Sequence, residues 1–439
     1  MTSIIKPRKL NSTRSSMSVE QDPIRWFRTA SPYIYAHRNK TFVVSLDQDA
    51  LRPSAFVSIA RDLTLLHALG VRLVVVHANA GALQVKTDSE TGHPVITASN
   101  LEAYLEQTGG TSQRLLAQLS AGLPNAVSQS SDLVAVSGNF IKAQPLGILN
   151  GIDQEHDGIV RRVNHLEMAK SLDQQALVIV PPLGYSLSGE TFGLDPTVLA
   201  GEIATALPAD KLIYFIDQDR LIDDAGQAIS ELTSAALDPA QWPTLSNLLT
   251  TAKKVVGSTS AKCHLIHPDH DGALLEELFT REGCGTQIVQ TPSAQLRPAQ
   301  LIDIHGILAL IEPLEATGAL VKRSRELIES ELSRFWVIVQ EGLIIGCGAL
   351  YPFHHGAEIA CLATDPLHRD LDHGDRLLKA LVQSAKAQAI DRVFVLTTQT
   401  AHWFKERGFE ATSVTDLPED KQALYNWQRN AKVFFRTVS

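Results

Sequence analysis

The sequence predicts an α/β protein built from two domains, and three observations lead to this fold class. Through the first two thirds of the chain, short continuous runs of Val, Ile and Leu alternate with amphipathic segments. This pattern is typical of a mostly parallel sheet that helices cover on both faces, a three-layer sandwich. After residue 298, two helical segments precede strands that resemble an antiparallel sheet. The 439 residues are enough for two or three domains, each with its own core.

Composition excludes several classes of function. The chain is 44% hydrophobic and 20% charged, with a net charge of −9 and no long basic block in the predicted domains, so we expect no nucleic-acid partner. No apolar run approaches the roughly 20 residues that span a bilayer, so we expect no membrane segment. The four cysteines show no CxxC or metal-ligand spacing, which favours reduced thiols in the cytoplasm and no bound metal.

Changes in composition divide the chain into four parts. Residues 1–21 are rich in Ser, Lys and Arg and predict a disordered tail; a transit peptide would look similar, but no amphipathic arginine periodicity is visible. Residues 22–290 form the first predicted domain, 291–298 a linker rich in Pro, Gln and Ser, and 299–439 the second domain. The first domain begins with a helix over 22–37, interrupted near Pro32, and its expected strands are 40–46, 71–78, 133–147, 159–163, 175–184, 211–217 and 263–268.

The stretch 356–378 contains the clearest candidate binding site. An apolar strand with a lone carboxylate, Glu358, runs through a polar loop into an amphipathic helix that opens near Gly374. Free backbone N–H groups at a helix N-terminus, with the positive end of the helix dipole behind them, suit a pyrophosphate. The alternative is an ordinary strand–helix unit whose loop is solvated.

The region resembles GNAT-type acetyltransferases, because a buried strand, a short helix and Gly408-Phe409 follow in the order of their acetyl-coenzyme A site. The usual loop is Arg or Gln, two residues, Gly, one residue, Gly or Ala, and here Asp372 replaces the first glycine. The resemblance implies acetyl-CoA as co-substrate. The positions that it implies for cofactor binding are Cys361, Leu362 and Ala363 on a bulged strand, and Arg369, Asp370, His373, Gly374 and Asp375 at the loop and helix.

Acetyl transfer to an amine requires a base, a polarised thioester carbonyl and a proton for the departing thiolate. Glu358 is the candidate base; the alternative is a solvent-facing carboxylate at a strand edge. Many GNAT enzymes place a Tyr acid where this chain has Phe404, which has no proton to donate. Thr397, Thr398 or solvent must then serve, and the resemblance favours Thr397.

With both domains considered, the chain resembles bacterial N-acetylglutamate synthases, an amino-acid kinase-like domain followed by a GNAT domain. Segments 71–78, 134–147, 271–288, 320–326, 357–364 and 424–429 carry this resemblance. It implies acetylation of L-glutamate in arginine biosynthesis, inhibition by L-arginine, and homo-hexamers in which Trp26, Phe27, Tyr33 and Tyr35 fit an interface or pack on their own domain. Implied substrate cations are Lys322, Arg323 and Arg429, and implied effector positions are Lys211, His264, Glu277 and Gly283.

The first domain departs from a working kinase. Amino-acid kinases hold ATP on glycine-rich turns, because a Cβ would keep the backbone from the phosphates. The first turn here, 45–49, has no glycine and carries Asp47 and Asp49. We therefore expect no phosphoryl transfer. The alternatives to a synthase are an acetylglutamate kinase, which these turns disfavour, and a catalytically weak protein that binds acetyl-CoA or arginine.

Overall fold

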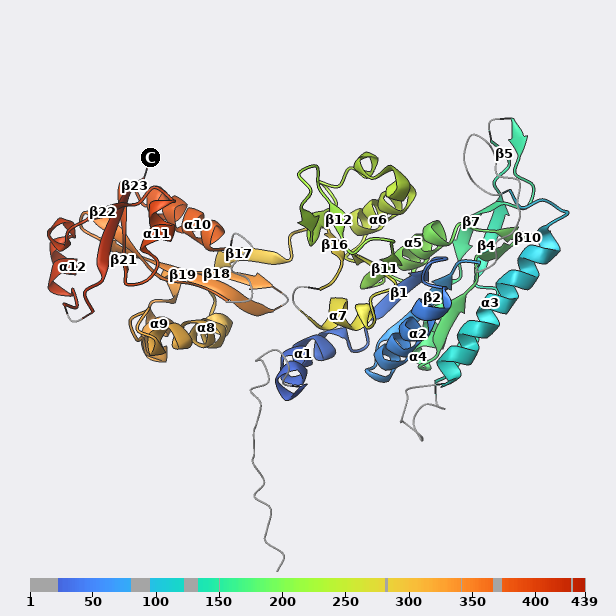
Figure 1. The fold of residues 1–439 in the computed structure, drawn as a ribbon, viewed down its shortest axis with the longest axis horizontal. Helices are drawn as coiled ribbons and strands as arrows, with labels where there is room; N and C mark the ends of the chain where they lie inside the picture. The colour runs from blue at the N-terminus through green and yellow to red at the C-terminus, as the bar shows by residue number, and fades with distance from the viewer. Residues whose placement is uncertain are drawn as a thin grey trace, which may run out of the picture. The chain divides into compact units, whose positions relative to one another are not determined.

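The structure is a computed structural model that describes residues 23–79, 95–121, 133–149, 151–280, 283–340, 342–365, 373–427 and 429–438. The chain forms two compact units, Met1–Thr291 and Pro292–Ser439 (Figure 1). The tail expected at 1–21 and the loop residues Arg369, Asp370 and Asp372 lie outside the described ranges. Within those ranges, no helix combines the length and apolar character that crossing a bilayer requires.

An eight-stranded sheet forms the centre of the first unit, and its order is β14-β16-β15-β11-β1-β2-β8-β3. Five neighbouring strands of the middle are parallel and almost wholly buried, as the continuous apolar runs predict. The strands are β1 (Thr41–Leu46), β2 (Arg72–His77), β3 (Ala135–Ser137), β8 (Leu177–Val180), β11 (Lys211–Phe215), β14 (Glu231–Thr233), β15 (Lys262–Ile266) and β16 (Thr286–Val289).

Helices cover both faces of this sheet (Figure 1). Alternate side chains of β1 enter two different cores: Val43 packs with α4, α5 and α6, whereas Phe42 and Val44 pack with α1, α2, α3 and α7. The three-layer sandwich expected from the sequence is therefore confirmed. The helices are α1 (Pro23–His37), α2 (Pro53–Ala68), α3 (Leu101–Ala121), α4 (His165–Asp173), α5 (Pro196–Ala206), α6 (Ser246–Ser258) and α7 (Ala273–Phe279).

The interruption expected near Pro32 is absent from α1, which is continuous. Proline lacks the N–H that would bond to the carbonyl four residues earlier. The Ser31 hydroxyl donates to that carbonyl, Arg28 O, at 2.8 Å, so the acceptor keeps a partner and the helix continues. Helix α7 ends at Phe279, four residues before Gly283.

A four-stranded sheet, β10-β9-β4-β7, packs on the α5 side of the main core through Ile141, Ala143 and Phe192. Strands β4 and β7 pair antiparallel. The expected strand 133–147 divides into β3 and β4, which belong to different sheets. The smaller strands are β4 (Ile141–Pro145), β5 (Ile148–Leu149), β6 (Ile152–Asp153), β7 (Gly158–Val163), β9 (Leu183–Tyr185), β10 (Thr191–Gly193), β12 (Leu221–Ile222) and β13 (Ala228–Ile229).

The second unit is one seven-stranded sheet, β17-β18-β19-β20-β21-β23-β22, with α8 and α9 packed on one face and α10 on the other. The expected linker 291–298 is wrong for its last five residues, which form β17 and pair with β18 along the sheet edge. The elements are β17 (Ala294–Pro298), α8 (Ile304–Ala316), α9 (Arg325–Ser330), β18 (Phe335–Gln340), β19 (Leu343–Phe353), β20 (Gly356–Thr364), α10 (His373–Ala387), β21 (Arg392–Thr397), α11 (Ala401–Lys405), β22 (Glu410–Thr412), α12 (Glu419–Ala423) and β23 (Lys432–Thr437).

Candidate acetyl-transfer and effector sites

Strand β20 contains the bulge expected at Cys361. Ala360 pairs with Ala349 and Ala363 with Cys347, so two residues, Cys361 and Leu362, oppose one on β19. Cys361 adopts a left-handed backbone with φ of 52°, which is unusual for a residue other than glycine. A bulge leaves its extra residue out of the ladder and locally disrupts the pairing of the strand.

Strands β20 and β21 pair only at their first residues. The parallel rungs join Ala357 to Val393 and Glu358 to Phe394, and the ladder between these two strands ends there. The bulge lies three residues beyond the last rung, on the part of β20 that has lost its β21 partner. Glu358 and the bulge therefore occupy one strand at the point where two strands of the sheet part.

Glu358 is held by an ion pair with a residue that the sequence analysis missed. Lys421 of α12 donates to Glu358 Oε2 at 2.6 Å, and only 12% of the Glu358 side chain is exposed. The Lys421 ammonium also lies 5.8 Å from the centre of the Phe353 ring. The carboxylate is thus fixed by a charged partner 63 residues away in the chain.

Thr397 ends β21, and its hydroxyl takes part in the turn that begins α11. The Thr397 oxygen accepts N–H bonds from Gln399 at 3.3 Å and Thr400 at 3.0 Å, and it lies 2.8 Å from the Thr400 hydroxyl. Thr398 is exposed. Phe404 is a core residue that packs edge-on against Phe409, so it has a structural role.

Helix α10 begins at His373, as the expected cofactor-binding helix requires. Gly374 lies against Trp403, whose ring would be 3.0 Å from any added Cβ. The Asp375 side chain is engaged by Arg407 through two bonds of 2.5 and 2.7 Å, which hold the pKa of that carboxyl below its usual value. Asp375 therefore has only its backbone N–H to offer a cofactor.

Two of the three expected substrate cations come from segments that meet in space. Arg429 donates to the carbonyls of Gly318 and Ala319, in the turn just before Arg323. The Arg323 guanidinium lies 5.6 Å from the centre of the Tyr351 ring, on the β19 strand that pairs with Glu358. Lys322, the third expected cation, is exposed.

The four expected effector residues are brought together in the first unit. The Lys211 ammonium donates to His264 Nε2 at 3.0 Å, and His264 Nδ1 donates to Glu277 Oε1 at 2.6 Å. Burial and the nearby Lys211 charge lower the pKa of His264 to about 4, so the ring is neutral at pH 7. Burial alone would raise the pKa of Glu277, but the bonds from His264 and two backbone N–H groups outweigh it and lower the pKa.

The turn after α7 wraps around the Glu277 carboxylate. Glu277 Oε2 accepts the N–H groups of Cys284 at 2.9 Å and Gly285 at 2.8 Å. Gly283 has φ of 57°, and a Cβ there would lie 2.3 Å from Glu277 Oε2, so only glycine fits. Sequence analysis missed Arg220, whose guanidinium donates to the Gly283 carbonyl at 2.8 Å.

The glycine-free turn after β1 is acidic, as expected. Burial raises the pKa of Asp47 to about 6, although the carboxylate accepts the Ala50 N–H at 2.8 Å. Arg52 lies 3.5 Å from Asp49 and 3.1 Å from Asp269. The Arg52 guanidinium is therefore already shared between two carboxylates. The second turn, from residue 80 onward, lies outside the described residues.

Comparisons with known proteins agree with this architecture. The Amino acid kinase family matches residues 40–242, and the Acetyltransferase (GNAT) domain matches residues 331–411. The chain is similar to an amino-acid acetyltransferase of Ectopseudomonas mendocina, with 41% identity over 95% of this chain and 100% of the relative. It is also similar to N-acetylglutamate synthase from Neisseria gonorrhoeae in two structures, each covering 95% of this chain. The complex with coenzyme A and L-arginine has 32% identity, 99% coverage of that chain and a TM-score of 0.83. The complex with coenzyme A and N-acetyl-glutamate has 33% identity, 100% coverage of that chain and a TM-score of 0.60.

The fold and the bulged strand define an acetyltransferase of the GNAT class with an amino-acid kinase-like domain before it. The sequence and structural relatives extend over nearly the whole chain rather than over one domain. The chain belongs to the amino-acid acetyltransferase family, as the sequence resemblance implies.

Proposed function

We propose that the protein is an N-acetylglutamate synthase, which transfers acetyl from acetyl-CoA to the α-amino group of L-glutamate in arginine biosynthesis and is inhibited by L-arginine. The observation that carries the proposal is the arrangement on β20, where Glu358 forms the last rung with β21 and the bulge at Cys361 lies three residues beyond it on the same strand. The Neisseria gonorrhoeae relative, which binds coenzyme A, L-arginine and N-acetyl-glutamate, supports each ligand.

In this proposal, Glu358 removes a proton from the α-ammonium of glutamate, through a water molecule, and the free amine attacks the thioester carbonyl. Backbone N–H groups of Cys361, Leu362 and Ala363 stabilise the oxyanion that develops. The C–S bond then breaks, and the thiolate takes a proton from Thr397 or from solvent. Lys421 keeps the Glu358 carboxylate in one position for this role.

The acceptor pocket requires cations for two carboxylates. Arg323 and Arg429 are the proposed partners, since a guanidinium offers a planar fork of donors. Arg429 is tied to the turn before Arg323, so its substitution would also disturb the second cation. At α10, the backbone N–H groups of His373, Gly374 and Asp375 are proposed to bind the pyrophosphate, together with Arg369 and Asp370.

The proposed effector site comprises Lys211, His264, Glu277 and Gly283. An arginine guanidinium would contact the Glu277 carboxylate and the Gly283 carbonyl, and Lys211 would face its carboxylate. Arg220 already donates to the Gly283 carbonyl. Effector binding must therefore displace this intramolecular guanidinium or share the carbonyl with it.

We also propose a cytoplasmic homo-oligomer, a hexamer by analogy with the family. Helix α1 supports a contact surface, because Phe27 is 60% and Tyr35 is 85% exposed. Tyr33 packs into the core that α1 shares with α2, α3 and α7, which is the alternative role foreseen for these aromatic residues.

The test is a thiol-release assay with L-glutamate, with other amino acids as controls, with and without arginine. Turnover with glutamate alone, suppressed by arginine, would support the proposal. Titration of acetyl-CoA in a calorimeter separates it from the second candidate, a weak acetyl-CoA or arginine binder, which Asp372 in the loop favours. Phosphorylation of glutamate or acetylglutamate by ATP would instead establish a kinase.

A further inference from the structure

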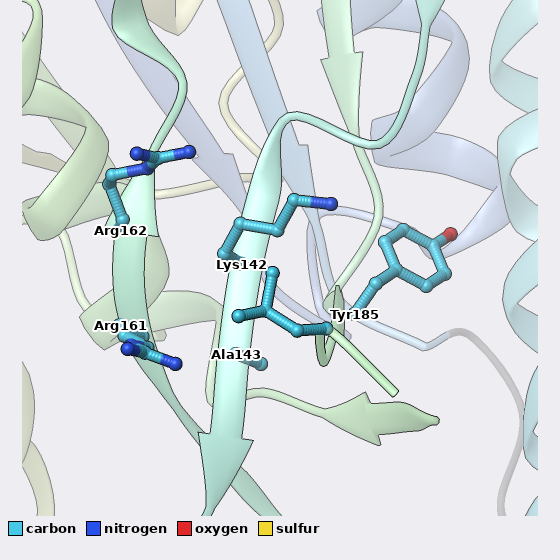
Figure 2. A pocket seen from close by; sticks show the side chains of 6 residues that line it. Lys142, Ala143, Arg161, Arg162 and Tyr185 are labelled. Atoms are coloured by element: carbon cyan, nitrogen blue, oxygen red, sulfur yellow. The ribbon is translucent and has the colours of Figure 1, made fainter. Parts of the chain in front are cut away.

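A positively charged pocket lies on the four-stranded sheet of the first unit. It has a volume of about 270 Å³, and its lining residues are Lys142, Ala143, Arg161, Arg162, Tyr185 and Leu187. Figure 2 shows Lys142 on the strand between the two arginines and the Tyr185 ring. The pocket shares no residue with the acetyl-transfer or effector sites described above.

The strand register explains why these side chains meet. Lys142 of β4 pairs with Arg162 of β7 on one side and with Tyr185 of β9 on the other. Residues directly opposite each other on neighbouring strands point to the same face of the sheet. The register of β7 shifts between Lys142 and Ala143, so Arg161 is an extra residue beside Arg162. A bulge re-aims the side chains next to it, and here it adds a second arginine beside the first. Lys142, Arg161 and Arg162 are called the row below.

Among the described residues, no neighbour neutralises the charges of Lys142, Arg161 and Arg162. Among the residues that the structure describes, Lys142, Arg161 and Arg162 make no ion pair and no side-chain hydrogen bond. Like charges directly opposite on paired strands are destabilising. Three cations gathered in one concave surface are therefore a feature that an anion would stabilise.

The size and lining of the pocket limit the class of anion. A volume of about 270 Å³ lies just below the range of pockets that hold drug-sized ligands, which favours a small molecule over a whole nucleotide. Two guanidinium groups and an ammonium match a doubly charged phosphate better than a single carboxylate. Ala143 and Leu187 provide apolar contact for a short carbon chain. We propose that this pocket binds a small phosphate monoester.

The test uses the full-length protein in a chloride buffer free of phosphate, with glycerol 3-phosphate and inorganic phosphate as probes in calorimetry. We expect saturable binding of the monoester with a dissociation constant below about 1 mM, and weaker binding of inorganic phosphate. Arg162→Gln and Lys142→Gln should each weaken binding by about tenfold or more. Arg114→Gln, on α3, is the matched control and should leave binding unchanged.

Three results would overturn the proposal. The first is no binding of either probe at about 10 mM, a concentration well above the expected constant. The second is binding that the Arg162 and Lys142 variants leave intact. The third is a change in oligomer size on gel filtration for these variants without any probe binding, which would identify the row as a contact for acidic side chains of a second copy. Because both side chains reach the surface, the variants are expected to fold, and circular dichroism checks this.

Discussion

Arg220→Met is expected to make the enzyme more sensitive to arginine. The Arg220 guanidinium donates to the Gly283 carbonyl at 2.8 Å and to the Cys284 carbonyl at 3.4 Å. If the effector guanidinium uses the Gly283 carbonyl, as proposed, it competes with a group of the same chemistry that is tethered beside it. Removing that group frees the acceptor before the effector arrives.

The size of the effect follows from the hydrogen bond. A bond from a charged donor contributes about 1.5 to 3 kcal/mol, and the lower end applies because Arg220 is half-buried and water replaces part of the contact. Since each 1.4 kcal/mol is a factor of ten, the arginine concentration for half inhibition should fall about tenfold. Turnover without arginine should not change, because Arg220 is in the kinase-like unit.

Thiol release against arginine concentration measures this shift, and calorimetry with arginine confirms that it reflects binding. Arg114→Met in the same unit serves as the control, because the Arg114 side chain donates to Thr111 of its own helix and not to any of the effector residues. Unchanged or weaker inhibition in Arg220→Met would refute the competition. Absence of any arginine effect in the wild type would instead refute the effector site itself.

Four further outcomes follow from the same contacts. Glu358→Gln should lower kcat by about 100-fold or more while acetyl-CoA affinity is kept, and wild-type turnover from pH 6 to 10 would contradict its role as base. Lys421→Met should lower kcat by about tenfold because the Glu358 carboxylate loses its partner, and Lys421→Arg should restore kcat. The same kcat in the wild type and both variants would argue against a positioning role for Lys421. Arg429→Ala should raise the KM for glutamate and leave the KM for acetyl-CoA nearly constant, whereas Lys322→Ala should change neither constant. A raised KM for acetyl-CoA with an unchanged KM for glutamate in Arg429→Ala would reject the assignment. Burial raises the pKa of Asp62 from 3.8 to about 7, so folding is penalised increasingly as the pH rises through this window. Asp62→Asn should therefore raise the free energy of unfolding more at pH 8 than at pH 5, with a difference between the two on the order of 2 to 3 kcal/mol. Thermal and denaturant unfolding at both pH values measure this, and an equal stabilisation at both would contradict it.

The sequence was informative wherever a local pattern determines the structure. Continuous apolar runs predicted the buried parallel strands, such as β1 and β2, because a strand covered on both faces has no polar side. The strand with Glu358 and its bulge was found from the GNAT resemblance, and the register confirms the bulge. The lone Pro32 misled the prediction, because the compensating bond comes from a neighbouring hydroxyl and leaves no pattern in the sequence.

The missed residues make contacts between segments far apart in the chain. Lys421 lies in the charged segment 419–423, which is typical of a solvated helix, and its ion pair depends on where α12 packs. Arg220 likewise follows a strand as one polar residue among several, 63 positions before its partner Gly283. The linker 291–298 lacked periodicity because β17 is an edge strand, which one neighbour is enough to hold.

The last rung between β20 and β21 has a consequence for how the catalyst is built. Glu358 belongs to the final pair that still ties two halves of the sheet, so its backbone is as rigid as the sheet interior. One position later the ladder between β20 and β21 ends, so the following residues of β20 have no partner on that side. The proposed base thus sits on the last backbone position that both neighbouring strands hold, directly before the segment that carries the bulge.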